Sequence, residues 1–459
     1  MKILRKQSFE SVKEGISHNG LKKSLTGLDL FLLGIGAVVG TGIFVLTGTA
    51  SQYSGPALIL SFLFSGISCM FVALIYTEIA AMLPVAGSVY TYSYVAFGEI
   101  FAILASLLLM LEFMFGAGAV SAGWSGYVVD VLKQGGVDIP FQYTVGPLEG
   151  GWLNVPAMII ALSVTAILTR GTKESAVLNN ILVAVKIIAI FLFLFIAAPH
   201  FDLKHWENFA PFGVGGITMA GAIVFFAFNG FDALATTAEE CKDPKKDLTV
   251  GLIGSLFVCT ILYMLVAGML TGIVDFRELN NSKPLAHALR LNGSNIGSAL
   301  VAAGGIAGMT TVVLAMIYAQ SRVFLVMARD GLMPSFFAKL HTKYNTPYIS
   351  TVLIGLTVSL IAGLVPIRIS GTLTSMGTLA VFIMASVVVI KLRRSLPNVD
   401  RPFKCPAIYA IGGIAIVCCS VLLLKLIPDF GKYFFSWIAF GMGLYLLTGS
   451  FRTKRSDNS

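Results

Sequence analysis

The chain has 459 residues, of which 56% are hydrophobic and only 12% are charged, and its formal net charge is +9. Soluble domains carry about 25% charged residues, so this composition excludes a soluble globular protein and indicates a polytopic membrane protein. The net charge does not require a nucleic-acid partner, because an excess of Lys and Arg in the loops on one side of a membrane produces the same balance.

Apolar runs separated by turn residues predict an all-α protein with about twelve transmembrane helices. In chain order the runs cover residues 28–50, 56–83, 97–132, 153–170, 177–199, 216–240, 248–274, 297–328, 347–364, 373–391, 406–426 and 433–450. Several exceed the roughly 20 residues that a span needs, so those helices are expected to tilt or to extend into water. The polar residues 1–27 are expected to precede the membrane domain without a cleavable signal, because the first run is too long for one.

Basic residues are distributed unequally between the two sides of this topology. The side that contains both termini has 22 Lys and Arg, the opposite side has eight, and the remaining two, Lys186 and Arg322, fall within spans. The positive-inside rule therefore predicts that the N-terminal segment 1–27 and the tail 451–459 are cytoplasmic.

Two of the apolar runs are interrupted near mid-depth. The run 28–50 contains four glycines between positions 34 and 42, and the run 216–240 contains the sequence FNGFD at 228–232. Irregular backbone at this depth is tolerated only where it lines a cavity enclosed by protein, and two interrupted spans at matching positions are typical of transporters with inverted repeats. We therefore expect a single transporter domain, 28–450, with one five-helix repeat in 28–199, an inverted one in 216–391 and two additional helices in 406–450.

The first interruption offers a site for an anion. If the helix restarts near Gly42, its free N–H groups and the positive end of its dipole face the cavity and suit a carboxylate. Gly40 allows close approach, and Thr41 adds a hydroxyl donor. Another interpretation stays open, because Gly36 and Gly40 also have the G-x-x-x-G spacing of a helix-packing face. A dinucleotide site is excluded, since no strand precedes the glycines.

The second interruption has the complementary charge. The half-helix that ends near Phe228 presents free carbonyls, which suit an ammonium group. Together the two half-helices describe a site for a zwitterionic α-amino acid. Phe226 and Phe231 are candidate walls or gates, with lipid-facing positions as the alternative, and Asn229 puts a polar group near the side chain of the substrate.

Three ionisable residues fall inside predicted spans: Glu112, Lys186 and Asp232. Each costs roughly 2.5–3.5 kcal/mol on insertion scales, so we expect them to be functional. Lys186 lies about 13 Å into its helix at 1.5 Å per residue. It is either the carrier of a coupling proton or a fixed cation that ties spans one, five and eight together. Glu112 either orients the substrate or relays the proton, or it only pairs within the bundle.

The cytoplasmic ends of the spans hold a further set of polar residues, namely Tyr76, Glu78, Glu239, Glu240, Arg322 and Asp330. Arg322 with Glu239 or Glu240 is a candidate inner-gate ion pair, and charges that face water at the interface are the alternative. The six cysteines match no zinc or redox spacing, and we interpret them as packing residues.

These residues resemble the amino acid–polyamine–organocation superfamily, and within it the bacterial members of the cationic amino acid transporter family. The matching segments are GIGAVVGTGIF at 34–44, YTEIA at 76–80, PVAGSVYTY at 84–92, FFAFNGFD at 225–232, AEE at 238–240 and RDGLMP at 329–334. They occur in the order of the family over nearly the whole chain, and they are specific as a set rather than singly.

The resemblance implies a five-plus-five inverted-repeat fold and import of L-amino acids with protons across the bacterial plasma membrane. It assigns the substrate carboxylate to Thr41 and Gly42 and the amine to carbonyls around Ile35, Phe226 and Ala227. It likens Lys186 to a lysine that fills the place of sodium in related carriers, which favours protons over sodium as the coupling ion. Met316 lies where the family adjusts the size of the side-chain pocket, and no other cofactor or metal is implied.

Other functions compete with this interpretation. An amino acid exchanger without net proton flux needs the same site. A polyamine carrier needs more acidic pocket residues than Glu112 and Asp232, and the bulk of Met316 argues against long cationic amino acids. The sequence GWSG at 123–126 is similar to the serine motif of an intramembrane protease, but all five histidines fall in loops or at interfaces, so an enzyme is not expected. No span shows the continuous polar stripe of a channel. The sequence does not identify an accessory subunit.

Overall fold

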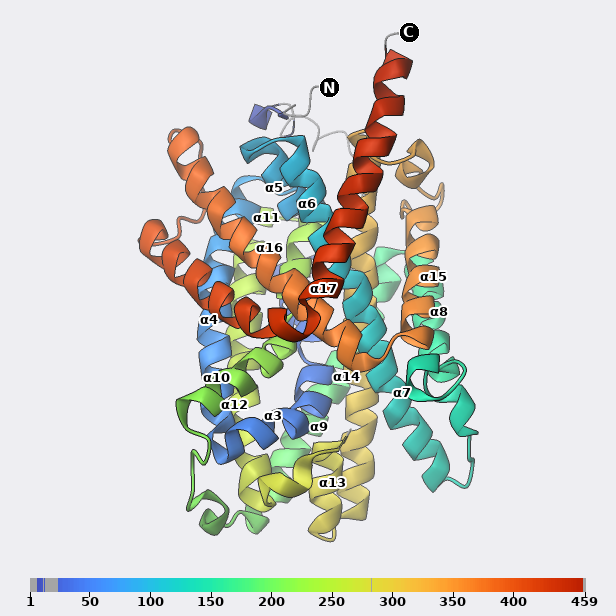
Figure 1. The fold of residues 1–459 in the computed structure, drawn as a ribbon, viewed down its shortest axis with the longest axis vertical. Helices are drawn as coiled ribbons and strands as arrows, with labels where there is room; N and C mark the ends of the chain where they lie inside the picture. Colours follow the sequence, from blue (N-terminus) through green and yellow to red (C-terminus); the bar gives the residue numbers. More distant parts are fainter. Residues whose placement is uncertain (1–5, 11, 13–23, 282, 457–459) are drawn as a thin grey trace.

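The computed structural model describes residues 6–10, 12, 24–281 and 283–456. Most of the expected cytoplasmic N-terminal segment and residues 457–459 of the expected tail lie outside the described residues. The described part is helical, and its only strand-like pairing is an isolated bridge between Leu25 and Cys241. Figure 1 shows the helices packed side by side along one long direction.

The helices are, in chain order, α2 (Gly27–Val38), α3 (Thr47–Ser54), α4 (Leu58–Met82), α5 (Val89–Ala96), α6 (Glu99–Met110), α7 (Gly116–Gln134), α8 (Val155–Thr169), α9 (Thr172–Ala197), α10 (Gly213–Val224), α11 (Pro244–Thr249), α12 (Ser255–Ile273), α13 (Pro284–Leu291), α14 (Asn295–Arg329), α15 (Tyr348–Leu364), α16 (Ile367–Ser395) and α17 (Ile408–Ser456). Three π-helical turns, Gly42–Leu46, Leu111–Phe115 and Val250–Gly254, interrupt or extend them. The second half of the run 216–240 is a 3-10 helix, Phe231–Glu240.

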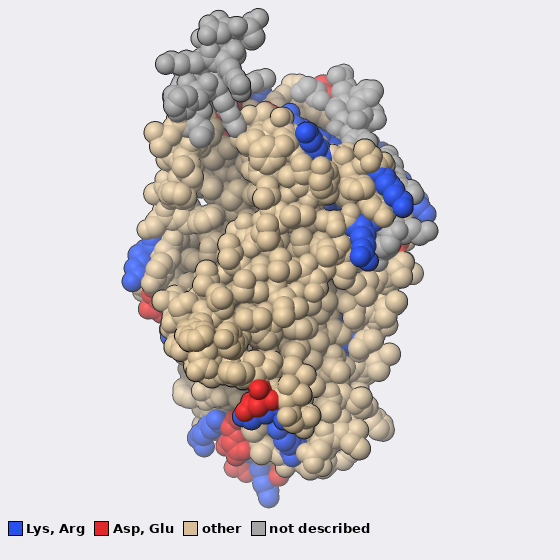
Figure 2. Space-filling model, turned by 90° about the vertical axis from the view of Figure 1, so that its right-hand side faces the viewer, with Lys and Arg blue, Asp and Glu red and all other residues tan. Residues whose placement is uncertain are grey.

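Eight helical stretches in the described residues are long and apolar enough to cross a membrane, and α8 and α15 are shorter apolar helices. Many large apolar side chains on these helices face outward, including Ile188, Phe195 and Leu424. Figure 2 shows a broad face without charged side chains between charged groups toward the two ends. An apolar belt of this kind fits lipid tails rather than water, so the all-α polytopic class predicted from the sequence is confirmed.

The helices follow one another in two similar series of lengths. In the first series, the long helical stretch Glu99–Gln134 has 36 residues, the short helix α8 that follows has 15, and α9 has 26. After the middle of the chain the series recurs as 35 residues in α14, 17 in α15 and 29 in α16. Before each series come one interrupted helix, 27–54 or 213–240, and then a further helix, α4 or α12. The interrupted helices are here called the first and the second broken helix.

Both interruptions occur where the sequence predicts them. In the first broken helix α2 ends at Val38, Val39 is extended, and helix resumes at Thr41. In the second the helix ends at Phe228, Asn229 is extended, and Gly230 has a φ of 102°. Glycine adopts such a positive φ without the steric cost that a Cβ imposes. The glycine cluster at 34–42 and the sequence FNGFD at 228–232 therefore mark the two breaks correctly.

The C-terminal region differs from the expectation. The sequence predicts two helices, 406–426 and 433–450, with a loop between them, but α17 is helical throughout and contains Pro428. Figure 1 shows that α17 changes direction sharply along its course. A proline removes one backbone hydrogen bond and bends a helix without ending it. The polar residues around Pro428 therefore indicate a bend, and the prediction of a loop there is wrong.

Gly230 provides a test of the break. A Cβ at this position would lie 3.1 Å from the carbonyl oxygen of Ala37, and the backbone has a φ of 102°. We expect Gly230→Ala to destabilise the protein by about 1–3 kcal/mol through strain, measured as a lower midpoint of thermal unfolding in detergent. Gly126→Ala is the matched control, because a Cβ there meets nothing within 4 Å. Equal midpoints for the two variants would contradict this account of the break.

Candidate functional site

The two breaks lie in direct contact. A Cβ on Gly42 would collide with the Cα of Ala227, and Gly230 lies against Ala37. The hydroxyl of Tyr263 on α12 lies 2.8 Å from the Val38 carbonyl and 2.9 Å from the Ala227 carbonyl. The hydroxyl is therefore within hydrogen-bond distance of one carbonyl from each broken helix, and the two carbonyls share its single proton. Glycine at 42 and 230 is required because only a residue without a side chain permits this approach.

The backbone also joins the two broken helices at their far ends. The N–H groups of Ser24 and Leu25 both donate to the carbonyl of Glu240, and the N–H of Lys242 donates to the carbonyl of Leu25. The start of the first broken helix is thus paired with the end of the second.

Lys186 caps the C-terminal end of α2, which is the first half of the first broken helix. Its ammonium nitrogen donates to the carbonyl oxygens of Ile35 (2.9 Å), Gly36 (3.0 Å) and Val39 (2.8 Å), and it lies 3.0 Å from Oγ1 of Thr311. The last carbonyls of a helix lack internal partners and carry the negative end of its dipole, so a cation is favourable there. The fully buried lysine joins α2, α9 and α14. This geometry fits the fixed tie, and the proton-carrier role stays a prediction.

The second half of the first broken helix begins directly after the carbonyls that Lys186 caps. Its first hydrogen bonds run from the N–H groups of Ile43 and Phe44 to the carbonyl of Gly40. The preceding N–H groups of Thr41 and Gly42 stand at the helix N-terminus, where backbone donors have no partner within the helix. Oγ1 of Thr41 is buried without a hydrogen-bond partner, and Thr41 lies against Gly123 of α7. The sequence predicts that a carboxylate binds at these donors, and that role stays a prediction.

The three carbonyls expected to hold an amine differ in how many further hydrogen bonds they can accept. The Ile35 carbonyl accepts hydrogen bonds from the N–H of Val39 (3.0 Å) and from Lys186, which uses both of its lone pairs. The Phe226 carbonyl accepts one bond, from the N–H of Asn229, and the Ala227 carbonyl accepts one from Tyr263. The two carbonyls of the second broken helix therefore retain acceptor capacity.

Side chains from three helices surround the breaks. Phe226 lies against Gly371 of α16, and Met316 of α14 and Thr374 of α16 both lie against Gly116 of α7. Phe231 packs with Tyr76 and Phe382, at ring-centroid distances of 6.1 and 5.2 Å.

Phe226 and Phe231 are 6% and 0% exposed, so the lipid-facing alternative for these two rings is wrong. Asn229 is 2% exposed, and neither atom of its amide has a hydrogen-bond partner.

The carboxyl groups of Glu112 and Asp232 are neighbours. Glu112 lies in the π-helical turn Leu111–Phe115, a type of distortion that is frequent at functional sites. The two carboxyl groups interact electrostatically, and the hydroxyl of Tyr76 lies 3.5 Å from Oδ2 of Asp232. Both oxygens of Glu112 and Oδ1 of Asp232 lack a hydrogen bond of standard geometry. No group of three His, Cys, Asp or Glu that could hold a metal occurs in the described part of the chain.

At the end of the second broken helix, the candidate gate residues are paired. Nε of Arg322 lies 3.0 Å from Glu240, and the side chains of both residues are 1% exposed. The alternative that these two charges face water is therefore wrong. Tyr318 donates to the same carboxylate at 2.6 Å, and its ring lies 3.6 Å below the Arg322 guanidinium. Glu239 pairs instead with Arg329, at 3.3 Å.

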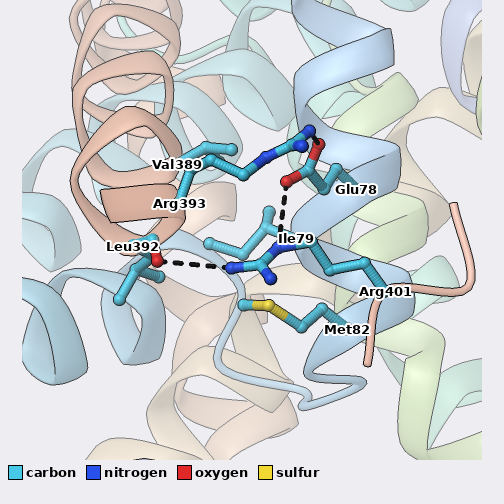
Figure 3. A pocket seen from close by; sticks show the side chains of 7 residues that line it. All are labelled: Glu78, Ile79, Met82, Val389, Leu392, Arg393 and Arg401. Atoms are coloured by element: carbon cyan, nitrogen blue, oxygen red, sulfur yellow. Dashed lines mark hydrogen bonds and ion pairs between the residues drawn. The ribbon is translucent and has the colours of Figure 1, made fainter. Parts of the chain in front are cut away.

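A second charge cluster at this end of the molecule was not predicted. Glu78 of α4 binds Arg393 of α16 at 2.5 Å and Arg401 of the following linker at 3.3 Å. Figure 3 shows both guanidinium groups converging on the one carboxylate. The sequence identifies Glu78 as a polar residue at a span end but leaves its partners, more than 300 positions away, in loops. Tyr263 and Tyr318 were also missed, because a tyrosine in an apolar run has no distinguishing pattern.

The six cysteines are free thiols, and all but Cys418 are buried. Burial raises the pKa of Cys405, which lies in the linker beside Glu78, to about 11, so it stays protonated at neutral pH. The six residues contribute to packing, as the sequence predicts.

Comparison with known proteins gives concordant matches. The family model described as amino acid permease matches residues 25–448. A branched-chain amino acid permease of Bacillus subtilis is 42% identical over 97% of each chain, and a methylthioribose transporter of the same bacterium is 40% identical, again over 97% of each. Cationic amino acid transporter 9 of Arabidopsis thaliana, a chloroplastic protein, is 39% identical over 74% of this chain and 61% of its own length.

The two ion pairs at the end of the second broken helix should differ in their contribution to stability. Glu240→Gln leaves the buried guanidinium of Arg322 without its carboxylate, a change that costs about 3–5 kcal/mol, and the midpoint of thermal unfolding should fall markedly. Glu239→Gln is the matched control, because Arg329 is 23% exposed and water can solvate it. A larger loss for Glu239→Gln would contradict the assignment of the buried pair.

Proposed function

Because the chain belongs to the amino acid permease family, we propose that it is a secondary transporter that brings L-amino acids into a bacterial cell together with protons. A multi-pass membrane protein of this family moves its substrate by exposing one site alternately to the two sides of the membrane. The observation that carries the proposal is the contact between the two broken helices. One of them presents free N–H groups at Thr41 and Gly42, and the other presents carbonyls at Phe226 and Ala227.

These opposite helix ends fit the two charges that every α-amino acid shares. The donors at Thr41 and Gly42 suit the carboxylate, and the carbonyls of Phe226 and Ala227 suit the ammonium group. Ile35 takes an indirect part, since its carbonyl is occupied by Lys186. Methylthioribose, the substrate named for one relative, has neither charge and would leave both helix ends unused. This argument favours an amino acid as the substrate.

The fold proposed for this function is a pair of inverted five-helix repeats, 28–199 and 216–391, followed by the additional helices in 406–450. The recurring series of helix lengths supports it, and so does the position of one broken helix at the start of each series. In Figure 1, α5 and α11 lie at the end of the molecule where α17 finishes, and α13 lies at the opposite end. This arrangement agrees with cytoplasmic termini in the bacterial plasma membrane.

Coupling to protons rather than sodium is supported by Lys186. Its ammonium fills the space between α2, α9 and α14, and the oxygen atoms that surround it are occupied by its own hydrogen bonds. The adjacent carboxyl groups of Glu112 and Asp232 provide a second group that can hold a proton. An exchanger without net proton flux is the rival function. It is favoured by the complete hydrogen bonding of Lys186, which fits a permanent cation.

The gate proposed for the cytoplasmic side consists of Arg322, Glu239 and Glu240. The pairs that they form with one another and with Arg329 connect the second broken helix to α14. We propose that these pairs close the inner side while the site is open to the outside, and that they separate when the substrate is released.

The decisive test is uptake of labelled alanine and arginine into proteoliposomes, with and without an inward proton gradient. We expect the gradient to drive accumulation of alanine but not of arginine, because Met316 fills the space that a long cationic side chain requires. Lys186→Ala should abolish the gradient-driven component. Lys204→Ala, at an exposed position in the short 3-10 helix Leu203–Trp206, serves as its control.

Three outcomes would overturn parts of this account. Uptake of arginine would contradict the restricted pocket. Exchange that ignores the gradient would favour the exchanger, and full gradient-driven uptake by Lys186→Ala would remove the lysine from the coupling mechanism.

The carboxylate site can be tested separately at Thr41. Thr41→Val removes one hydrogen bond to a charged group, which contributes about 1.5–3 kcal/mol, so the affinity for every amino acid should fall by about 10- to 100-fold. The ranking of substrates should not change. Thr218→Val is the control, because that hydroxyl bonds only to carbonyls of its own helix. A changed ranking in Thr41→Val, measured by competition for uptake, would contradict the carboxylate assignment.

A further inference from the structure

The side chain of Asn229 ends in an amide, a polar group that is not needed to bind the carboxylate or the ammonium of an amino acid. It lies in the interruption of the second broken helix, with extended backbone at φ −64° and ψ 143°. Its side chain is buried, and neither Oδ1 nor Nδ2 has a hydrogen-bond partner in the protein. Buried amides in native proteins are almost always paired. The amides of Asn179 and Gln320 are also unpaired but lie within helices, whereas Asn229 lies in the break that is proposed to bind the substrate.

Asn229 stands between residues that join the two broken helices. The ring of Phe228, which precedes it, packs with Phe62 of α4 and Tyr263 of α12. Gly230, which follows it, lies against Ala37, and Ala227 lies against Gly42. The unpaired amide therefore belongs to the junction of the two breaks, where the backbone groups proposed to bind the substrate also lie.

We propose that the transporter selects amino acids whose side chain bears a hydroxyl or amide group, such as threonine, serine and asparagine, and that Asn229 recognises that group. This inference rests on the proposed transport of amino acids. A substrate hydroxyl donates to Oδ1 of Asn229 and accepts from Nδ2, so both amide atoms gain a partner. When the substrate has an apolar side chain of the same shape, the amide of Asn229 stays buried without a hydrogen-bond partner.

Threonine and valine separate this effect from the effect of size, since they differ by a hydroxyl in place of a methyl group. A site that is built to bond a hydroxyl rejects the analogue that lacks it, because its own polar groups then stay unpaired. We expect threonine to bind about 10- to 100-fold more tightly than valine. The relative at 42% identity is described as a branched-chain amino acid permease, so the two proteins would differ in the side chains that they prefer.

The experiment is competition in exchange across proteoliposome membranes. Vesicles containing the full chain are loaded with unlabelled threonine, and entry of labelled threonine is measured against external threonine, serine, alanine or valine. Exchange needs no proton gradient, so the result does not depend on the coupling ion. In the unmodified protein, valine should compete about 10- to 100-fold less well than threonine.

Asn229→Leu keeps the size of the side chain and removes both polar atoms, and it should equalise threonine and valine or reverse their order. Asn179→Leu is the matched control, because Asn179 is also fully buried with an unpaired amide, but it is on α9 and lies against Gly36 of α2. Its ratio of threonine to valine affinity should equal that of the unmodified protein. If Asn229→Leu does not fold, Asn229→Asp, which keeps the shape and one polar acceptor, takes its place and should change the ratio, while the ratio in the unmodified protein still tests the preference for a hydroxyl.

Two results would overturn the inference: valine that competes as well as threonine in the unmodified protein, or a preference for threonine that survives in Asn229→Leu. The proposed function fails in a different way. In that case none of the four amino acids competes, and loading with threonine does not accelerate its entry.

Discussion

The site depends on one set of interactions, the hydrogen bonds from the ammonium of Lys186 to the carbonyls at the end of α2. A helix that stops inside a membrane leaves polar carbonyls where no water can bond to them, at a cost of several kcal/mol for each unsatisfied group. Lys186 satisfies three of those carbonyls, and in return they provide the negative environment that a buried cation needs. The break is stable because two unfavourable features compensate each other.

The cap at Lys186 determines what the next residues can do. The carbonyls of Ile35, Gly36 and Val39 are bonded to Lys186, and the N–H groups at Thr41 and Gly42 are the donors that the first broken helix offers to a substrate. The second broken helix contributes carbonyls from its own first half, at Phe226 and Ala227. Because Gly42 and Gly230 have no side chains, the donor end and the acceptor end approach closely enough to bind two groups on one small molecule.

The sequence predicted those parts of the site that depend on local properties. The glycine cluster at 34–42 and the sequence FNGFD at 228–232 located both breaks, because a weak helix former at mid-depth acts on its own backbone. The choice of Glu240 over Glu239 as the partner of Arg322 could not be predicted, since adjacent carboxylates are equivalent until the direction of the 3-10 helix is known. The filled capacity of the Ile35 carbonyl and the role of Tyr263 depend on packing between distant segments, which periodicity does not encode. The bend of α17 was mistaken for a loop because proline and neighbouring charges mark both.

The position of Lys186 also bears on how the polypeptide is made. The oxygen atoms that hold its ammonium come from α2, synthesised some 150 residues earlier in the chain, and from Thr311 on α14, synthesised more than 100 residues later. When α9 leaves the ribosome, its lysine has at most part of its final coordination, and a lone lysine at mid-membrane opposes insertion. The span Val177–His200 is otherwise strongly apolar, with a mean hydropathy of 3.0, which offsets the roughly 2.5–3.5 kcal/mol that a central lysine costs. The coordination of Lys186 is complete only after α14 has joined, so the site is finished by contact between helices and not by the insertion of α9.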